Sequence, residues 1–222
     1  MADKDSRARV MIVDDHPIMR HGMAQLIDAQ DDLTVCSWAG TATEALTAIS
    51  RDQPELALLD ISLPDRNGLE LLKDIRVLHP EVKVLMVSMH DESLYAERAL
   101  RAGARGYIMK EEAADKLIEA IHTILAGRIY VSGEMSARII EMFSGNKGDS
   151  QSAPLSRLSD RELEVFEEIG RGKATREVAG MLGISARTVD AHRAHLKKKL
   201  GLKDGSELVR YAVRWVETGK LD

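Results

Sequence analysis

Residues 8–15 read ARVMIVDD, an apolar run of strand length that ends in two aspartates, Asp14 and Asp15. Four similar runs follow, and they read LTVCSWAG (33–40), ELALLDI (55–61), VKVLMVSM (82–89) and GYIMK (106–110). None of the five alternates strictly between apolar and polar residues, which is typical of parallel strands buried on both faces. The five runs therefore predict a parallel sheet.

Segments with helical spacing of apolar residues separate these runs and follow the last one. We expect helices over residues 18–29, 43–50, 69–78, 93–102 and 113–126. The regular alternation predicts an α/β fold, a (βα)5 doubly wound parallel sheet with helices on both faces. It occupies residues 1–127, and its site should lie at the carboxyl ends of the strands.

The second part of the chain has a different pattern. Residues 128–154 are predicted to be a linker with a short helix capped by Ser132, and the polar stretch SGNKGDSQSAP (144–154) is typical of a flexible connection. Residues 155–222 predict a small all-α domain of four helices. The linker separates the two domains.

Cap signals place the helices of the second domain. Ser159 and Glu162 form a capping box for the first helix, and Thr175 is the expected cap of the second. A three-residue connection (183–185) leads into a third helix over residues 186–200, ended by Gly201. The fourth begins near Asp204, so the domain predicts a helix-turn-helix.

Charge is distributed unevenly along the chain. Residues 1–150 carry 17 basic and 25 acidic residues, whereas residues 151–222 carry 14 basic and 11 acidic ones. No apolar run approaches the ~18 residues of a membrane span, and we find no secretory signal. We therefore expect a soluble, cytoplasmic protein without a membrane partner, in which the single cysteine, Cys36, is a packing thiol.

Polar side chains end four of the five strands. Asp14 and Asp15 follow the first strand, and Asp60 follows the third. Ser88 ends the fourth strand, and Lys110 follows the fifth. These side chains should therefore meet in one crevice. Three carboxylates that close cannot all stay ionised without a cation. Oxygen ligands favour Mg²⁺, with Asp15 and Asp60 as direct ligands and Asp14 acting through water.

Asp60 is then the candidate nucleophile toward a phosphoryl group, because aspartyl phosphates are established covalent intermediates. Lys110 would neutralise the phosphate and Ser88 would donate a hydrogen bond to it. Tyr107, on the fifth strand, would follow the space that Ser88 vacates.

The motifs VDDHP, LLDISLPDRNGLELL, VSMHD and GYIMK resemble the receiver domain of bacterial two-component response regulators over residues 8–126. The resemblance implies a sensor histidine kinase as phosphoryl donor, Mg²⁺ as cofactor, Asp60 as acceptor, and supporting roles for Asp14, Asp15, Ser88 and Lys110.

Two residues depart from the receiver pattern. Glu111 stands where many receivers have proline after the active-site lysine, so we expect a trans peptide bond there, since a non-proline cis bond costs about 2.5–4 kcal/mol. Met89 occupies a place usually held by a small residue. We hypothesise that its bulk restricts water access to the phosphoaspartate and slows its hydrolysis.

The predicted third helix of the second domain is strongly basic. Residues 184–203 hold six basic residues and one acid, Asp190, which favours contact with DNA phosphates. Candidate DNA-binding residues are Lys173, Thr175, Ser185, Arg187, Thr188, Asp190, Ala191, His192, Arg193, Lys197, Lys198 and Lys199. Asp190 is either a base-reading residue that accepts a hydrogen bond from cytosine or an acidic residue on the helix surface. For His192, packing or contact with phosphate is favoured over base reading.

Residues 158–202 closely resemble the LuxR-type helix-turn-helix, so nearly the whole chain resembles a NarL/FixJ-type regulator. The resemblance implies that phosphorylation releases the DNA-binding domain and favours homodimers on double-stranded DNA, with RNA polymerase as a further candidate partner. The last helix, with Leu208, Val209, Ala212 and Trp215, is either a dimer face or packed against its own domain.

Two alternatives stay open. An Asp-nucleophile phosphohydrolase typically needs an acidic residue two positions after the nucleophile, where this chain has Ser62, so we expect no enzyme. A receiver that controls protein docking, with an interaction module in place of a DNA-binding domain, is disfavoured by the basic helix.

Overall fold

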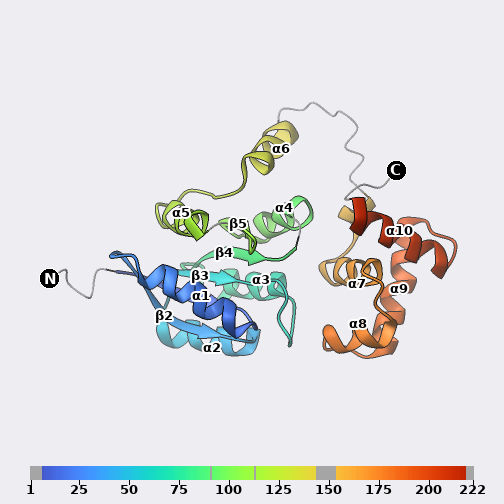
Figure 1. Cartoon of the computed structure of the whole chain (residues 1–222), viewed down its shortest axis with the longest axis horizontal. Coiled ribbons are helices and arrows are strands. Elements are labelled where there is room, and N and C mark those ends of the chain that lie inside the picture. Colours follow the sequence, from blue (N-terminus) through green and yellow to red (C-terminus); the bar gives the residue numbers. More distant parts are fainter. Residues whose placement is uncertain (1–6, 91, 113, 144–153, 219–222) are drawn as a thin grey trace. The chain divides into compact units, whose positions relative to one another are not determined.

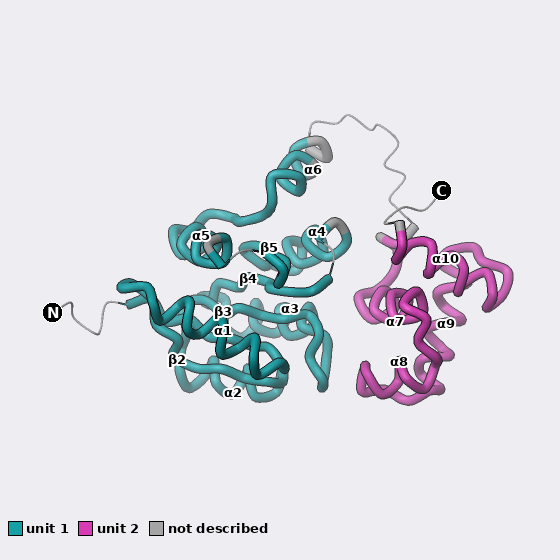
Figure 2. The backbone as a smooth tube through the Cα atoms, in the orientation of Figure 1, with its two compact units in different colours: residues 1–146 teal, residues 147–222 magenta. Residues whose placement is uncertain are grey.

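A computed structural model describes residues 7–90, 92–112, 114–143 and 154–218 of the chain. The chain divides into two compact units, residues 1–146 and 147–222 (Figure 2). Among the described residues, no helix combines the length and apolarity that crossing a membrane would require.

The first unit is built on five parallel strands (Figure 1). They are β1 (Ala8–Val13), β2 (Leu33–Ala39), β3 (Leu56–Leu59), β4 (Lys83–Ser88) and β5 (Gly106–Met109). Their spatial order, β2-β1-β3-β4-β5, confirms the predicted doubly wound sheet. The order reverses between β1 and β3, so a crevice opens at their carboxyl ends.

Five helices connect and cover these strands, and each lies within about two residues of its predicted bounds. They are α1 (Pro17–Asp28), α2 (Ala42–Asp52), α3 (Gly68–Leu78), α4 (Glu92–Ala102) and α5 (Ala114–Leu125). One core cluster joins α1 and α5 to one face of the sheet, with Ile27 and Ile121 fully buried against strand residues such as Ile12 and Leu58. Because side chains alternate along a strand, Met11 and Leu59 face the other side, toward α2, α3 and α4.

After α5 the chain forms α6 (Gly133–Phe143). The Ser132 hydroxyl accepts a hydrogen bond from the Met135 amide at 3.0 Å, which confirms Ser132 as the cap of this helix. The rest of the expected linker, residues 144–153, lies outside the described residues.

The second unit is helical, as predicted. A short 3-10 helix η1 (Pro154–Arg157), which we did not predict, precedes α7 (Asp160–Gly170), α8 (Thr175–Met181), α9 (Ala186–Leu200) and α10 (Gly205–Thr218). Ser159 and Glu162 form the expected capping box on α7, and Gly201 ends α9 at φ 70°. The prediction that Thr175 caps α8 is wrong: the cap is Ala174, whose amide donates to the Glu177 carboxylate at 2.7 Å.

The last helix packs against its own unit. Leu208 and Ala212 are fully buried and Trp215 nearly so, with the Trp215 ring 6.2 Å from the ring of Phe166 on α7. A Cβ on Gly170 would lie 2.5 Å from the Ala212 carbonyl oxygen, so glycine is required for this approach. Of the residues proposed as a dimer face, only Val209 stays exposed.

Candidate functional site: an acidic crevice and a basic helix

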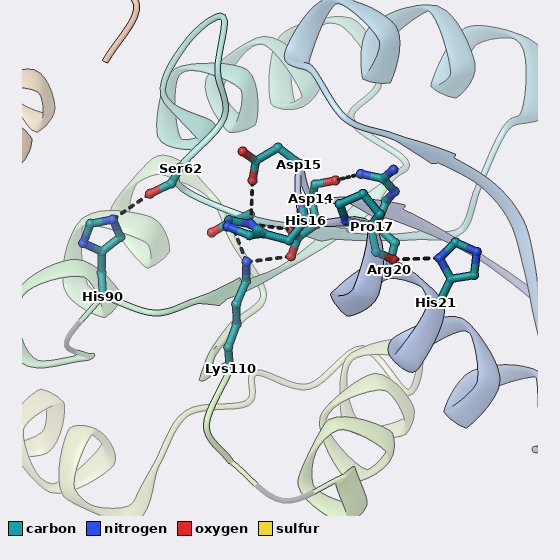
Figure 3. Close-up of polar contacts among 10 residues, drawn as sticks. Asp14, Asp15, His16, Pro17, Arg20, His21, Ser62, His90 and Lys110 are labelled. Atoms are coloured by element: carbon teal, nitrogen blue, oxygen red, sulfur yellow. Dashed lines mark hydrogen bonds and ion pairs between the residues drawn. The ribbon is translucent and has the colours of Figure 1, made fainter. Parts of the chain in front are cut away.

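Three side chains close the crevice at the carboxyl ends of β1, β3 and β5. The Lys110 ammonium lies 2.7 Å from Asp60 Oδ2. It also lies 2.6 Å from Asp14 Oδ2, and Figure 3 shows Lys110 beside Asp14. All three side chains are at most 3% exposed. The structure therefore brings together residues 14, 60 and 110 as the strand-end argument predicts.

Asp15 joins this group through His16. The His16 ring Nδ1 lies 2.7 Å from Asp15 Oδ1 and 3.2 Å from Asp14 Oδ1 (Figure 3). The His16 amide also donates to Asp14 Oδ1 at 2.8 Å. Asp15 itself is exposed, so it stands at the rim while Asp14 and Asp60 form the floor.

Burial raises the pKa of Asp60 above its ordinary value; Asp14 adds to this effect, and the Lys110 charge opposes it. Burial favours the neutral amine of Lys110, yet the charges of Asp60 and Asp14 raise its pKa. Asp14 and Asp60 thus share the positive charge of one buried lysine.

The donor set fits a small, hard divalent ion. One possible ligand atom from each of Asp14, Asp15, His16 and Asp60 lies within 4.8 Å of every other. Three of these donors are carboxylate oxygens, the ligands that Mg²⁺ prefers.

Ser88 and Tyr107 are both tied to His90, a residue that the sequence analysis missed. The Ser88 hydroxyl accepts from the His90 amide at 3.3 Å, and the Tyr107 hydroxyl donates to the His90 carbonyl at 2.7 Å. The His90 ring lies against the Tyr95 ring, tilted by 38° with centroids 4.6 Å apart. Its Nε2 atom lies 2.9 Å from the Ser62 hydroxyl (Figure 3). His90 therefore links the loop after Asp60 to both expected switch residues.

Gly68 is a second residue that we missed. A Cβ at this position would lie 2.0 Å from the Asp60 carbonyl oxygen, and the Gly68 amide donates to the Ile61 carbonyl at 2.7 Å. The segment Asn-Gly in DRNGLELL was the available signal, because it indicates a tight turn before a helix. Gly68 lets the start of α3 pack directly on the backbone of Asp60.

The two departures from the receiver pattern have different outcomes. No cis peptide bond occurs among the described residues, which confirms the trans bond between Lys110 and Glu111. Met89 is 56% exposed, and its shielding of a phosphoaspartate stays a prediction.

In the second unit, α9 presents an exposed stripe. Val189 and Leu196 are buried, while the solvent face carries residues that share a helical spacing of three, four and seven: Arg187, Asp190, Ala191, Ala194 and Lys198. The Ser185 hydroxyl caps the helix by accepting from the Thr188 amide at 3.0 Å. This face brings several predicted DNA-binding residues together.

Other candidates on this unit lie differently. Lys199 forms an ion pair with Glu162 on α7, so its ammonium is already engaged within the unit. His192 is half-buried and burial lowers its pKa, so its ring is mainly neutral at pH 7. Lys173, Arg187 and Lys198 are exposed, whereas Thr175, Arg193 and Lys197 are half-buried.

Arg161 is a further residue that the sequence analysis did not single out. Its guanidinium pairs with Glu164 at 2.7 Å and donates to the carbonyl of Leu182, at the end of α8. It thereby holds the turn before α9 against α7.

Comparison with known proteins agrees with this geometry. Residues 10–122 match the family described as the response regulator receiver domain, and residues 156–212 match the luxR family of bacterial regulatory proteins. The chain belongs to the response regulators. It is a two-component response regulator with a LuxR-type DNA-binding domain, a class of transcription regulator.

Known proteins match between about two thirds and nearly all of this response regulator. The oxygen regulatory protein NreC of Staphylococcus carnosus (strain TM300) is 35% identical over 210 residues, which cover 93% of this chain and 97% of that protein. A LuxR-family response regulator from Aurantimonas sp. SI85-9A1 has 36% identity and a TM-score of 0.58, over 63% of this chain and 99% of its own. RcsB of Salmonella typhimurium shares the fold, with a TM-score of 0.69 and 22% identity over 94% of this chain and 98% of its own.

Proposed function

We propose that Asp60 accepts a phosphoryl group from a sensor histidine kinase and that this modification controls sequence-specific DNA binding by the second unit. The observation that carries the proposal is the buried triangle of Asp60, Asp14 and Lys110. A structural salt bridge needs one carboxylate per ammonium, whereas here two carboxylates converge on one lysine, and burial raises the pKa of Asp60. Such perturbation is typical of a functional site.

Mg²⁺ would be held by Asp14, Asp15 and Asp60, where it would neutralise charge on the phosphoryl oxygens during transfer. The P–N bond of the donor phosphohistidine breaks as a P–O bond to an Asp60 oxygen forms. Lys110, already beside that oxygen, pairs with the product phosphate.

Ser88 and Tyr107 then respond to the phosphoryl group on Asp60. To donate to a phosphate oxygen, the Ser88 hydroxyl would point its hydrogen toward Asp60, while its oxygen accepts from the His90 amide. Tyr107 is buried, and its hydroxyl donates to the His90 carbonyl. A shift of the backbone at His90 would therefore move the Tyr107 side chain. These are small local events that bias a two-state element.

Phosphorylation at Asp60 can be tested with the full chain, Mg²⁺ and phosphoramidate as a small donor, followed by intact-mass analysis. The parent should gain one phosphoryl group and Asp60→Asn none. Asp74→Asn, which changes an exposed carboxylate on α3, is the matched control and should label like the parent. Equal labelling of the Asp60→Asn protein contradicts the proposal.

The exposed face of α9 supports DNA contact by the second unit. Ala191 and Ala194 lie at its centre, and small side chains allow close approach to a groove, while Arg187 and Lys198 flank them. Of the predicted contacts we retain Lys173, Thr175, Ser185, Thr188, Asp190, His192, Arg193 and Lys197 as candidates, and assign Lys199 mainly to the pair with Glu162.

Asp190 is exposed in the middle of this face, which supports base reading over a role within the unit. An Asp190→Ala protein should lose discrimination at one position when it is compared on matched duplexes that differ by one base pair. A uniform change across all duplexes argues against base readout.

The remaining parts of the proposal are a homodimer on two half-sites after phosphorylation, contact with RNA polymerase, a cytoplasmic location and no enzymatic turnover. Ser62, at the second position after Asp60, bonds to the His90 ring and offers no carboxylic acid for hydrolysis. Rapid release of phosphate from phosphoramidate would favour the phosphohydrolase. Labelling without any DNA binding would favour the docking regulator.

A further inference from the structure

The segment that follows α5 returns to the sheet beside β5. The Tyr107 amide donates to the Tyr130 carbonyl at 3.1 Å, and the Tyr130 amide donates to the Arg105 carbonyl at 3.0 Å. Gly106 and Tyr130 form a parallel bridge. The first residues of the connection to the second unit thus cover the outer edge of β5, which is otherwise an edge strand of the sheet.

Gly106 makes this close approach possible. A Cβ at position 106 would lie 2.6 Å from the Tyr130 carbonyl oxygen, so any larger residue would push the segment away. The contact of Tyr130 with β5 therefore depends on close packing of the two backbones.

A second anchor holds the start of α6. The Ser132 amide donates to the Glu92 carboxylate at 3.1 Å, and Glu92 is the first residue of α4. Met135, in the first turn of α6, is 3% exposed, and α6 contacts α4. The amino terminus of α6 is thus capped twice, by its own Ser132 hydroxyl and by a carboxylate from the receiver.

Both anchors belong to elements that carry the phosphate-reading residues. Tyr107 holds the His90 carbonyl with its hydroxyl and the Tyr130 carbonyl with its backbone amide. Glu92 lies two residues beyond His90, on the helix that the same loop begins. A movement of Ser88 and His90 toward a phosphate would therefore act directly on Tyr107 and close to Glu92, the two residues that hold the connection.

We propose that Glu92 is a positioning residue that couples phosphorylation to DNA binding by holding the amino terminus of α6, with Tyr130 on β5 as the second anchor. This inference rests on the proposed function. It assigns the output of the receiver to two hydrogen-bonded contacts at the start of the segment that leads into α6, that of Tyr130 with β5 and that of Ser132 with Glu92 on α4. Cutting the Glu92 anchor should leave phosphoryl transfer intact and uncouple the DNA-binding unit from it.

The test compares three full-length variants. Glu92→Ala removes the carboxylate that accepts from the Ser132 amide, whereas Glu92→Gln keeps an oxygen that can accept this hydrogen bond. Glu97→Ala, the control, removes another carboxylate of α4, which pairs with Arg101. Each is measured for phosphoramidate labelling and for affinity, with and without the donor, toward a duplex that the phosphorylated parent selects from a random library. A coupling of ordinary size would give the parent about a 5- to 150-fold gain in affinity.

We expect all three variants to label like the parent. The gain in affinity should collapse toward one-fold for Glu92→Ala and stay within about twofold of the parent for Glu92→Gln and Glu97→Ala. Hydrogen exchange at residues 128–136 should respond to the donor in the parent and be fast in both states of Glu92→Ala.

The proposal is overturned if Glu92→Ala keeps the parent's gain, or if Glu97→Ala loses it equally. If Glu92→Ala fails to fold, Tyr130→Pro, which removes the amide that donates to Arg105, must give the same uncoupling. A parent that neither labels nor gains affinity instead refutes the proposed function, because that outcome does not depend on Glu92.

Discussion

At the scale of single residues, Asp60 combines function with a cost in stability. Its pKa is raised by burial, so ionising it disfavours the folded state. The cost appears as the pH rises above the ordinary value of 3.8 and is complete above the raised pKa in the folded protein. At neutral pH the ionised Asp60 side chain therefore lowers the stability of the first unit.

Asp60→Asn should accordingly stabilise the first unit at pH 7, by roughly 1 kcal/mol or about 4 °C in unfolding temperature. The gain should shrink as the pH falls below the ordinary range of an aspartate. Thermal unfolding of parent and variant at several pH values measures it. A variant that is less stable than the parent at pH 7 shows that the ion pair with Lys110 outweighs burial.

Gly68→Ala should disturb the acceptor loop, because its Cβ would lie 2.0 Å from the Asp60 carbonyl oxygen. We expect a loss of roughly 2–4 kcal/mol in unfolding free energy, as for other severe steric changes, and slower labelling. Gly22→Ala is the matched control. It lies within α1 with nothing within 4 Å of the new Cβ, and should stabilise by about 0.5–1 kcal/mol.

Met89→Ala should lose its phosphoryl group faster than the parent if the side chain shields the phosphoaspartate from water. The measurement is the decay of labelled protein after removal of the donor. A decay no faster than the parent's eliminates this role, which would be consistent with the large exposure of Met89.

At the scale of elements, the capping box of α7 does more than begin a helix. Glu162 accepts from the Ser159 amide at 2.7 Å and pairs with Lys199 on α9, so one carboxylate joins the first and third helices of the unit. Burial acts to raise the pKa of Glu162, but the hydrogen bonds from Lys199 and Ser159 outweigh it and lower the pKa. This contribution is present above the ordinary value of 4.5 and is lost as the pH falls.

Glu162→Gln should therefore destabilise the second unit at neutral pH by about 1 kcal/mol, the usual worth of a cap interaction. Its stability should also fall less steeply than the parent's below pH 4.5. In a Trp38→Phe background, the fluorescence of Trp215 follows the unfolding of this unit alone, because the chain has two tryptophans. Parallel pH profiles of parent and variant contradict the assignment.

The lysines at the end of α9 offer a second test at this scale. Lys198 is free on the solvent face, whereas Lys199 is held by Glu162. Lys198→Ala should lower the dependence of log K on log salt by about one unit, since one phosphate contact is lost. Lys199→Ala should instead cost stability and leave the salt slope nearly unchanged. Equal slopes for the two variants contradict this division of roles.

At the scale of the whole molecule, the two units should respond separately to a ligand of the acidic crevice. Mg²⁺ with beryllofluoride, a phosphoryl analogue, should raise the unfolding temperature of the first unit, because a ligand that binds only the folded state stabilises it by about 2.7 kcal/mol at 100 times its Kd. Trp38 reports on the first unit and Trp215 on the second. A shift confined to Trp215, or absent from the Asp60→Asn control and the parent alike, contradicts the site.

Patterns in the sequence were enough to predict the class of fold and to bring most of the acidic site together. Buried parallel strands are marked by continuous apolar runs, and their carboxyl ends must share one edge, so Asp14, Asp60 and Lys110 could be placed together without coordinates. Local signals were equally sufficient for the caps at Ser132 and Ser159, since capping acts within one turn of a helix. Thr175 failed because the local pattern allowed two neighbouring starts for α8.

Residues that act between elements could be identified only from the three-dimensional contacts. His90, Gly68, Glu92 and Lys199 each owe their role to a partner at least eight positions away or in another element, and no periodicity encodes such a contact. The same holds for α10, whose apolar face suited either a second copy or its own unit until packing against Phe166 showed which surface covers it. Side-chain packing depends on the full set of neighbours, so it is settled only when the chain has folded.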